Sequence, residues 1–188
     1  MNPVSRSEIL DFATYGDTRP ATKLEMQTVK GPRRVHLGEH LTFLFENHET
    51  IRHQVQEMVF IERLVREADI QHEIDTYNEI LGGAGELGCT LLIEIESAEE
   101  RAVLLKQWLG LPEHCYLVLP DGSRVRASHD ARQIGEDRVS SVQFMKFDTR
   151  GAIPVSIGCD HPHLSIEAEL PAAAREALEQ DLAVDRTP

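Results

Sequence analysis

Two glutamates fall among apolar residues on predicted helices, where a carboxylate needs a partner. On a helix spanning about residues 47–66, Glu62 lies within an apolar stripe and Gln54 lies at its edge; the stripe consists of Ile51, Val55, Met58, Ile61 and Val65. On a second helix, about residues 68–81, Glu73 falls between Tyr77 and Ile80. A buried and unpaired carboxylate costs several kcal/mol, so each glutamate requires an arginine, a hydrogen-bond network or a metal ion.

Histidines near these glutamates are candidate nitrogen ligands for the same chemistry. His72 is next to Glu73, while His53 and Glu57 are one helical turn apart and could share a metal ion or a hydrogen bond. A second concentration of ligand atoms is the run Cys159-Asp160-His161-Pro162-His163, in which alternate positions of an extended chain point the same way. The alternatives stay open: buried salt bridges to Arg34, Arg52, Arg63 or Arg101, and a simple polar turn at 159–163.

No sequence motif of known chemistry accompanies these residues. The chain has no H-E-x-x-H zinc motif and no G-x-S-x-G nucleophile turn. Gly82-Gly83-Ala84-Gly85 lacks the lysine of a phosphate-binding loop, and the Glu-x-x-His pairs of di-iron bundles are missing. The sequence therefore favours an unusual site over a familiar one.

The elements that would position these residues form one α+β domain with a largely antiparallel sheet and a central helical pair. The helical pair covers about 47–81, the sheet-rich part about 89–170 and a terminal helix about 171–182. Alternating apolar residues at 34–37 and 41–46 predict a hairpin, and short helices are expected at 5–12 and 21–30, separated by Gly16 and Pro20.

Charge and cysteine content narrow the range of partners and compartments. The 188 residues carry a formal charge of −13, which repels phosphate backbones and argues against a nucleic-acid partner. The basic group Lys30, Arg33 and Arg34 could hold one anion, or it is a solvated strand start. No apolar run is long enough for a membrane span or a signal peptide, and three widely spaced cysteines suit a reducing cytoplasm.

Several segments resemble a bacterial family of domains of unknown function. The likeness covers nearly the whole chain and rests on Phe45-Glu46-Asn47, Gln54-Val55-Gln56-Glu57-Met58, Glu62-Arg63, the run 71–79, Gly85-Glu86-Leu87, the run 90–95, Arg132-Gln133-Ile134, and Gly158 with Asp160-His161-Pro162. Cys159 and His163 lie outside this pattern, which leaves Asp160 and His161. Members of the family are typically encoded beside rubrerythrin-like and heterodisulfide-reductase-like iron–sulfur proteins, so the resemblance implies an accessory role near iron or redox chemistry.

The leading hypothesis is therefore a cytoplasmic metal-binding or redox-accessory protein. Its expected ligands are Glu62, Glu73, His72 and His161, with Glu57 and Asp160 supporting them, and such a mixed set suits iron, manganese or zinc. A rubrerythrin-like or iron–sulfur redox protein is the expected partner. The alternatives are a non-catalytic acidic interaction protein for a redox partner, and an enzyme with a small-molecule pocket lined by Gln54, Asp75 and Asn78.

Overall fold

The hairpin predicted from alternating apolar residues begins the larger of two sheets. The computed structural model describes residues 1–129, 135 and 137–184, and in it β1 (Arg34–Leu37) pairs with β2 (Leu41–Glu46). β3 (Glu86–Ile93), β7 (Val142–Asp148) and β6 (Ser128–His129) complete this sheet in the order β1-β2-β3-β7-β6. A second sheet, in the order β5-β4-β8-β9, contains β4 (Cys115–Val118), β5 (Arg124–Arg126), β8 (Ser156–His161) and β9 (Leu164–Glu169). Every strand pairing among the described residues is antiparallel.

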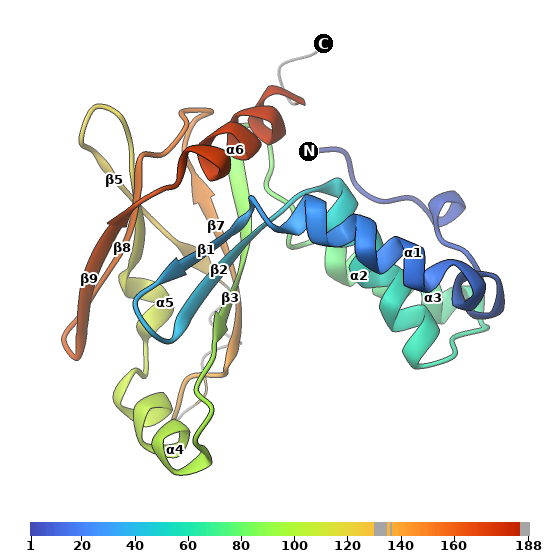
Figure 1. Cartoon of the computed structure of the whole chain (residues 1–188), viewed down its shortest axis with the longest axis horizontal. Helices are drawn as coiled ribbons and strands as arrows, with labels where there is room; N and C mark the ends of the chain where they lie inside the picture. Colours follow the sequence, from blue (N-terminus) through green and yellow to red (C-terminus); the bar gives the residue numbers. More distant parts are fainter. Residues whose placement is uncertain (130–134, 136, 185–188) are drawn as a thin grey trace.

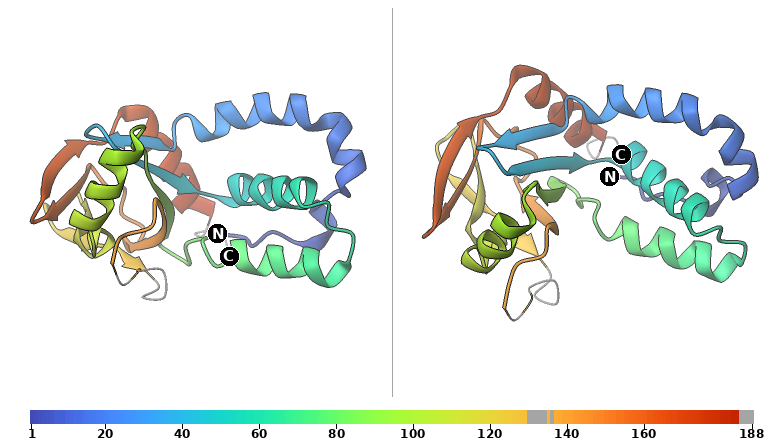
Figure 2. Two further views of the ribbon diagram at one scale, coloured as in Figure 1. Left: turned by 90° about the horizontal axis from the view of Figure 1, so that it is seen from below. Right: turned by 60° about the horizontal axis from the view of Figure 1, so that its bottom comes forward.

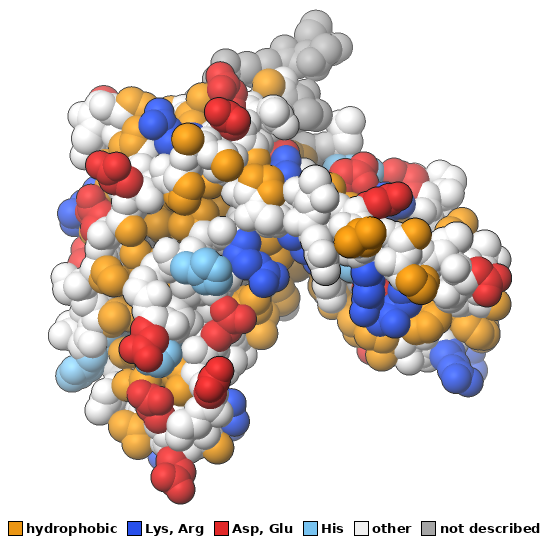
Figure 3. Space-filling view, viewed as in Figure 1, with side chains coloured by type: hydrophobic (Ala, Val, Ile, Leu, Met, Phe, Trp, Pro, Cys, Tyr) orange, Lys and Arg blue, Asp and Glu red, His pale blue; other side chains and the backbone are white. Residues whose placement is uncertain are grey.

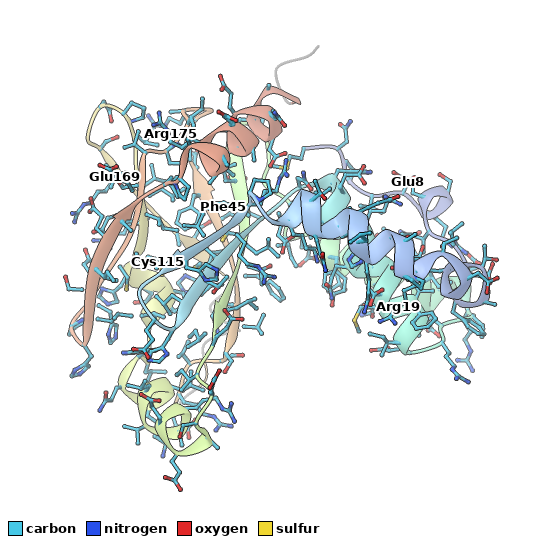
Figure 4. All side chains as sticks on the ribbon, in the orientation of Figure 1. Glu8, Arg19, Phe45, Cys115, Glu169 and Arg175 are labelled. Atoms are coloured by element: carbon cyan, nitrogen blue, oxygen red, sulfur yellow. The ribbon has the colours of Figure 1, made fainter. Side chains whose placement is uncertain are left out.

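The two sheets face each other across the main hydrophobic core, and we call this part the sandwich lobe. Phe43 and Phe45 alternate toward the core from β2, and Leu117 and Ile157 meet them from the second sheet. Figure 4 labels Phe45 on its strand. The lobe also contains α4 (Ala98–Gln107), α5 (Leu111–His114) and α6 (Ala172–Val184), and α6 covers one end of it in Figure 1.

Three helices form a second lobe, the helical lobe, which projects from one end of the larger sheet. It contains α1 (Phe12–Lys30), α2 (His48–Ile61), α3 (Glu67–Asn78) and a short turn, η1 (Arg6–Glu8). α2 lies between α1 and α3 in both views of Figure 2. The lobe is attached where α1 runs into β1, β2 into α2 and α3 into β3, so the helices have their own small core around Ile51, Val55 and Ile74.

The first helix is longer than the sequence indicates. Gly16 and Pro20 predict a break, yet α1 runs without interruption from Phe12 to Lys30, and the expected helix at 5–12 is only the short turn η1. Asp11 caps the helix by accepting hydrogen bonds from the N–H groups of Ala13 and Thr14. Proline inside a helix removes one backbone hydrogen bond, and we attribute the continuity of α1 to its packing along α2.

The second helix is shorter than predicted, and this changes the position of Glu62. α2 ends at Ile61 because Arg63 adopts a left-handed conformation (φ 52°) and the Leu64 N–H donates to the Val59 carbonyl, 3.0 Å away. A helix end of this kind usually carries glycine, so the sequence gives no sign of it. Ile61, the last residue of α2, is 62% exposed and Val65, beyond its end, is 72% exposed, so neither belongs to a buried apolar stripe.

The α+β class and the antiparallel sheets predicted from the sequence are confirmed. Residues 132–134, which contributed to the family resemblance, lie outside the described residues. Within the described ranges, no helix has both the length and the apolar character needed to cross a membrane.

A buried ion pair joins the two lobes. Arg33, in the link between α1 and β1, donates from Nε and Nη2 to the two carboxylate oxygens of Asp181 on α6, at 2.7 and 2.8 Å. Its Nη1 also donates to the Val29 carbonyl at the end of α1, and Asn47 Nδ2 donates to Asp181 from the start of α2. Both side chains of the pair are less than a tenth exposed, so its geometry fixes where α1 ends and β1 begins.

We expect Asp181→Asn to lower the free energy of unfolding by about 3–5 kcal/mol, since it leaves the Arg33 guanidinium buried without its counter-charge. Urea unfolding followed by circular dichroism measures the loss. Glu179→Gln removes an exposed carboxylate from the same helix and should change stability by less than about 0.5 kcal/mol. Equal effects of the two substitutions would contradict a structural role for the pair.

Candidate functional site: a basic pocket between α1 and β1

A stripe of polar and basic side chains runs along the face of α1 that contacts α2. Tyr15, Arg19, Lys23, Met26 and Lys30 are spaced by three or four residues, so they share one side of the helix. His53 and Glu57, one turn apart on α2, lie opposite this stripe. The two helices therefore bring basic groups from one side to a carboxylate and an imidazole on the other.

Glu57 on α2 accepts the hydrogen bonds that connect this helix to α1. Its oxygens accept hydrogen bonds from Arg19 Nε and Nη2, each at 2.9 Å, and from the Tyr15 hydroxyl at 2.8 Å. Lys23 Nζ lies 3.7 Å away. Burial raises the pKa of Glu57, but the Arg19 and Tyr15 hydrogen bonds outweigh it and hold the pKa at about 2. Arg19 reaches from α1 toward α2 in Figure 4, and the fully paired Glu57 carboxylate is ionised at neutral pH.

His53 is enclosed beside this carboxylate without forming a hydrogen bond to it. Its Nε2 lies 4.0 Å from Glu57 Oε1, which is too long for a hydrogen bond, and neither ring nitrogen has a partner among the described residues. Burial, followed by the nearby charge of Lys30, lowers the pKa of His53 to about 4. The imidazole is therefore neutral at pH 7, with both nitrogens still unpaired.

A cavity of about 310 Å³ opens next to His53, where α1 ends and β1 begins. We call it the basic pocket and define it by its lining residues, Lys23, Met26, Gln27, Lys30, Gly31, Arg34 and His53. Figure 3 shows a hollow between the two lobes with Lys and Arg side chains on both of its walls. The pocket is strongly positive although the whole chain carries a charge of −13.

Two of the lining cations have no counter-charge in contact. Within residues 1–129, 135 and 137–184, neither Lys30 nor Arg34 forms an ion pair. Burial lowers the pKa of Lys30, the effect expected of a cation taken out of water without a partner in contact. The buried carboxylate of Glu46 acts on both cations through space, but its oxygens accept hydrogen bonds from Thr50 and Thr90 instead. The arrangement is suited to binding a negatively charged group.

Glu62 and Glu73, the glutamates predicted to lie on apolar helix faces, do not line this pocket. The prediction that Glu62 lies on a buried stripe is wrong, because α2 ends before it and the side chain is exposed at the helix end. Glu73 is half-buried in the middle of α3, and the neighbouring His72 is exposed. No ion pair of Glu62 or Glu73 occurs in the described part of the chain, so the predicted salt-bridge network does not form there either.

The expected small-molecule residues have local roles. Asn78 donates to the Val4 carbonyl and accepts from the Val4 N–H, which ties the chain before η1 to α3. Asp75 accepts a hydrogen bond from Gln71 one turn earlier. Gln54 is half-buried on α2. None of the three lines the basic pocket.

His161 and Asp160 lie in the sandwich lobe, and both are already bonded. His161 Nε2 is 3.2 Å from the Leu109 carbonyl, and its Nδ1 accepts from the His163 N–H at 3.2 Å, so both ring nitrogens are occupied. Asp160 accepts two hydrogen bonds from Arg126, and these hold the pKa of its carboxyl well below the usual range. The expected turn at 159–163 is instead the end of β8 followed by Pro162 and His163.

The predicted metal ligands are thus not brought together in the described structure. Across residues 1–129, 135 and 137–184, no group of three or more His, Cys, Asp or Glu side chains is placed to hold a metal ion. Glu57, expected to support such a site, is instead engaged by Arg19 and Tyr15. Binding of iron, manganese or zinc, and a redox partner, stay predictions of the sequence and of the family resemblance.

The sequence contained a signal for the basic pocket. Lys30, Arg33 and Arg34 left two interpretations open, one bound anion or a solvated strand start, and the structure gives them different positions: Arg33 turns inward to Asp181, while Lys30 and Arg34 line the pocket. The matching stripe on α1 was missed because Gly16 and Pro20 predicted a break in the helix.

His53 makes the stability of the fold depend on pH. The folded-state pKa lies below that of an exposed histidine, so the unfolded chain binds the proton first, and stability is lost as the pH falls from about 6.5 to about 4. In wild type, we expect urea unfolding to give a free energy about 1–2 kcal/mol lower at pH 5 than at pH 7 from this group alone. His53→Gln should reduce the difference between the two pH values by that amount, whereas His72→Gln, at an exposed position, should preserve it. An unchanged difference in His53→Gln would show that His53 is not held neutral by the fold.

Comparison with known proteins places the chain in a family. The model of the family described as "Protein of unknown function (DUF3501)" matches residues 3–182. A crystal structure described as a novel protein of unknown function from Burkholderia pseudomallei K96243 is similar, with 31% sequence identity and a TM-score of 0.88 over 96% of this chain and 100% of the other. No curated protein matches the sequence. The chain therefore belongs to the family of proteins of unknown function DUF3501.

Proposed function

We propose that the protein binds a small organic anion in the basic pocket. The observation that carries this proposal is the pair Lys30 and Arg34, two cations that line a cavity and have no ion pair within the described chain. Lys30 is partly buried, so leaving its charge without a counter-charge is unfavourable, and a bound anion removes that penalty. Arg34 is exposed and adds a second positive charge at the same cavity. In a chain with 32 acidic and 19 basic residues, such a local excess of positive charge is not a consequence of composition.

The lining is rich in groups that bind an anion. Its seven residues include lysine, arginine, glutamine and histidine donors and contain no carboxylate that would repel a negative charge. The side chain of Met26 and the methylene groups of the lysines give the wall an apolar part. Charged donors beside apolar wall are typical of sites that hold small organic ligands rather than bare ions.

Contacts outside the basic pocket hold the surrounding chain in place. Glu57 holds Arg19 and is close to Lys23, while the Arg33–Asp181 pair fixes the chain on either side of Gly31. The backbone positions of Lys30 and Arg34 are therefore set by contacts that do not involve the ligand. A site arranged in advance loses less entropy when the ligand binds.

The test is isothermal titration calorimetry at low ionic strength with acetate, succinate and propyl phosphate. We expect wild type to bind at least one of these anions, and Lys30→Gln or Arg34→Gln to weaken binding about tenfold or more, because each removes a charge-assisted contact. Arg175→Gln, which removes an exposed cation from α6, should bind as wild type does. Absence of binding to every anion, or equal binding by Arg34→Gln, would contradict the proposal.

A further inference from the structure

The charges around the basic pocket leave two cations uncompensated, which indicates the charge of the ligand. Lys23, Lys30 and Arg34 line the cavity. Arg19 binds Glu57 through two hydrogen bonds and Lys23 Nζ lies 3.7 Å from the same carboxylate, so the single charge of Glu57 offsets one of these two cations and leaves the other.

Glu46 is the other carboxylate that acts on this region. Burial raises its pKa, and it lies near Lys30 and Arg34 without contacting them. Even when Glu46 is ionised, the two carboxylates Glu46 and Glu57 offset only two of the four cations of this region, which are Arg19, Lys23, Lys30 and Arg34. The complementary ligand therefore carries two negative charges, since a monoanion would leave one cation unmatched.

Such a ligand would change the protonation of His53. Three cations act on the imidazole, Lys30 and Lys23 on α1 and Arg52 on α2, Arg34 on β1 lines the same cavity, and one carboxylate, Glu57, lies 4.0 Å away. Arg52 is paired with Glu49, but the other three face the pocket. Two negative charges in the cavity offset these cations and favour the protonated imidazole. Protonated His53 also has two N–H donors, which gives its unpaired nitrogens the capacity to bond to the ligand or to Glu57.

The size of the pocket limits the body of the ligand. Its volume of about 310 Å³ is at the lower end of the range for small-molecule sites. That leaves room for two carboxylates on a short carbon chain, or for one phosphate with a small apolar group against Met26. The pocket is larger than a single inorganic anion requires.

We propose that the basic pocket takes a small organic dianion, a dicarboxylate or a phosphomonoester on a short carbon body, and that His53 takes up a proton as the dianion binds. This inference rests on the proposed function and specifies its ligand. A dicarboxylate and a phosphomonoester both carry two negative charges within a few ångströms of each other, and the experiment distinguishes the two ligand classes.

The first measurement compares ligands of one shape and different charge by calorimetry at pH 7.5. Succinate is matched with succinamate, and propyl phosphate with methyl propyl phosphate, each second compound having one negative charge fewer. We expect at least one dianion to bind about tenfold more tightly than its matched monoanion, since it pairs with one more cation. The pair with the larger difference identifies the ligand as dicarboxylate or phosphomonoester. Equal affinities within both pairs would overturn the inference while leaving the proposed anion site intact.

The second measurement counts protons with the dianion that binds more tightly. Titrations at pH 7.5 in buffers of different ionisation enthalpy should show net proton uptake by wild type. His53→Gln should still bind the dianion but lose that uptake, because glutamine keeps a donor and cannot titrate. If the first measurement favours a dianion and uptake is absent in wild type, or persists in His53→Gln, the role of His53 is overturned. If neither dianion nor monoanion binds, the proposed function fails as well.

Discussion

The ion pair between Arg33 and Asp181 is the contact on which the arrangement of the two lobes depends. It is buried, it uses both carboxylate oxygens, and it brings together the end of α1, the start of β1, the start of α2 and helix α6. Because Arg33 turns inward, its neighbour on β1, Arg34, faces the opposite side of the strand. The same chain segment thus supplies one arginine to the buried ion pair and one to the basic pocket.

Much of the fold could be predicted from local pattern. The hairpin at 34–46 formed with the expected bounds, since apolar alternation and a connecting glycine determine it. The helices were less predictable. The proline in α1 is tolerated because the helix packs along α2, and α2 ends at a left-handed arginine where a glycine would be usual. Both outcomes depend on tertiary contacts or on a rare backbone conformation, which sequence periodicity does not record.

The candidate site was less accessible to sequence reasoning. The helical wheel drew attention to Glu62 because it assumed a helix to about residue 66, whereas α2 ends at Ile61, and a side chain beyond a helix end is not held on its apolar face. His53 and Glu57 were recognised as a one-turn pair. The hydrogen-bond partners of Glu57, Tyr15 and Arg19, however, lie 42 and 38 positions away from it in sequence, so only the packing of α1 on α2 reveals them.

The central claim is that Lys30 and Arg34 bind an anion. A crystal structure determined after soaking with succinate and with propyl phosphate tests this claim most directly. The account predicts density for one of these ligands in the basic pocket, with its charged oxygens within hydrogen-bonding distance of Lys30 and Arg34. A structure in which both cations are paired with carboxylates of the protein itself, and in which neither ligand occupies the pocket, would contradict it.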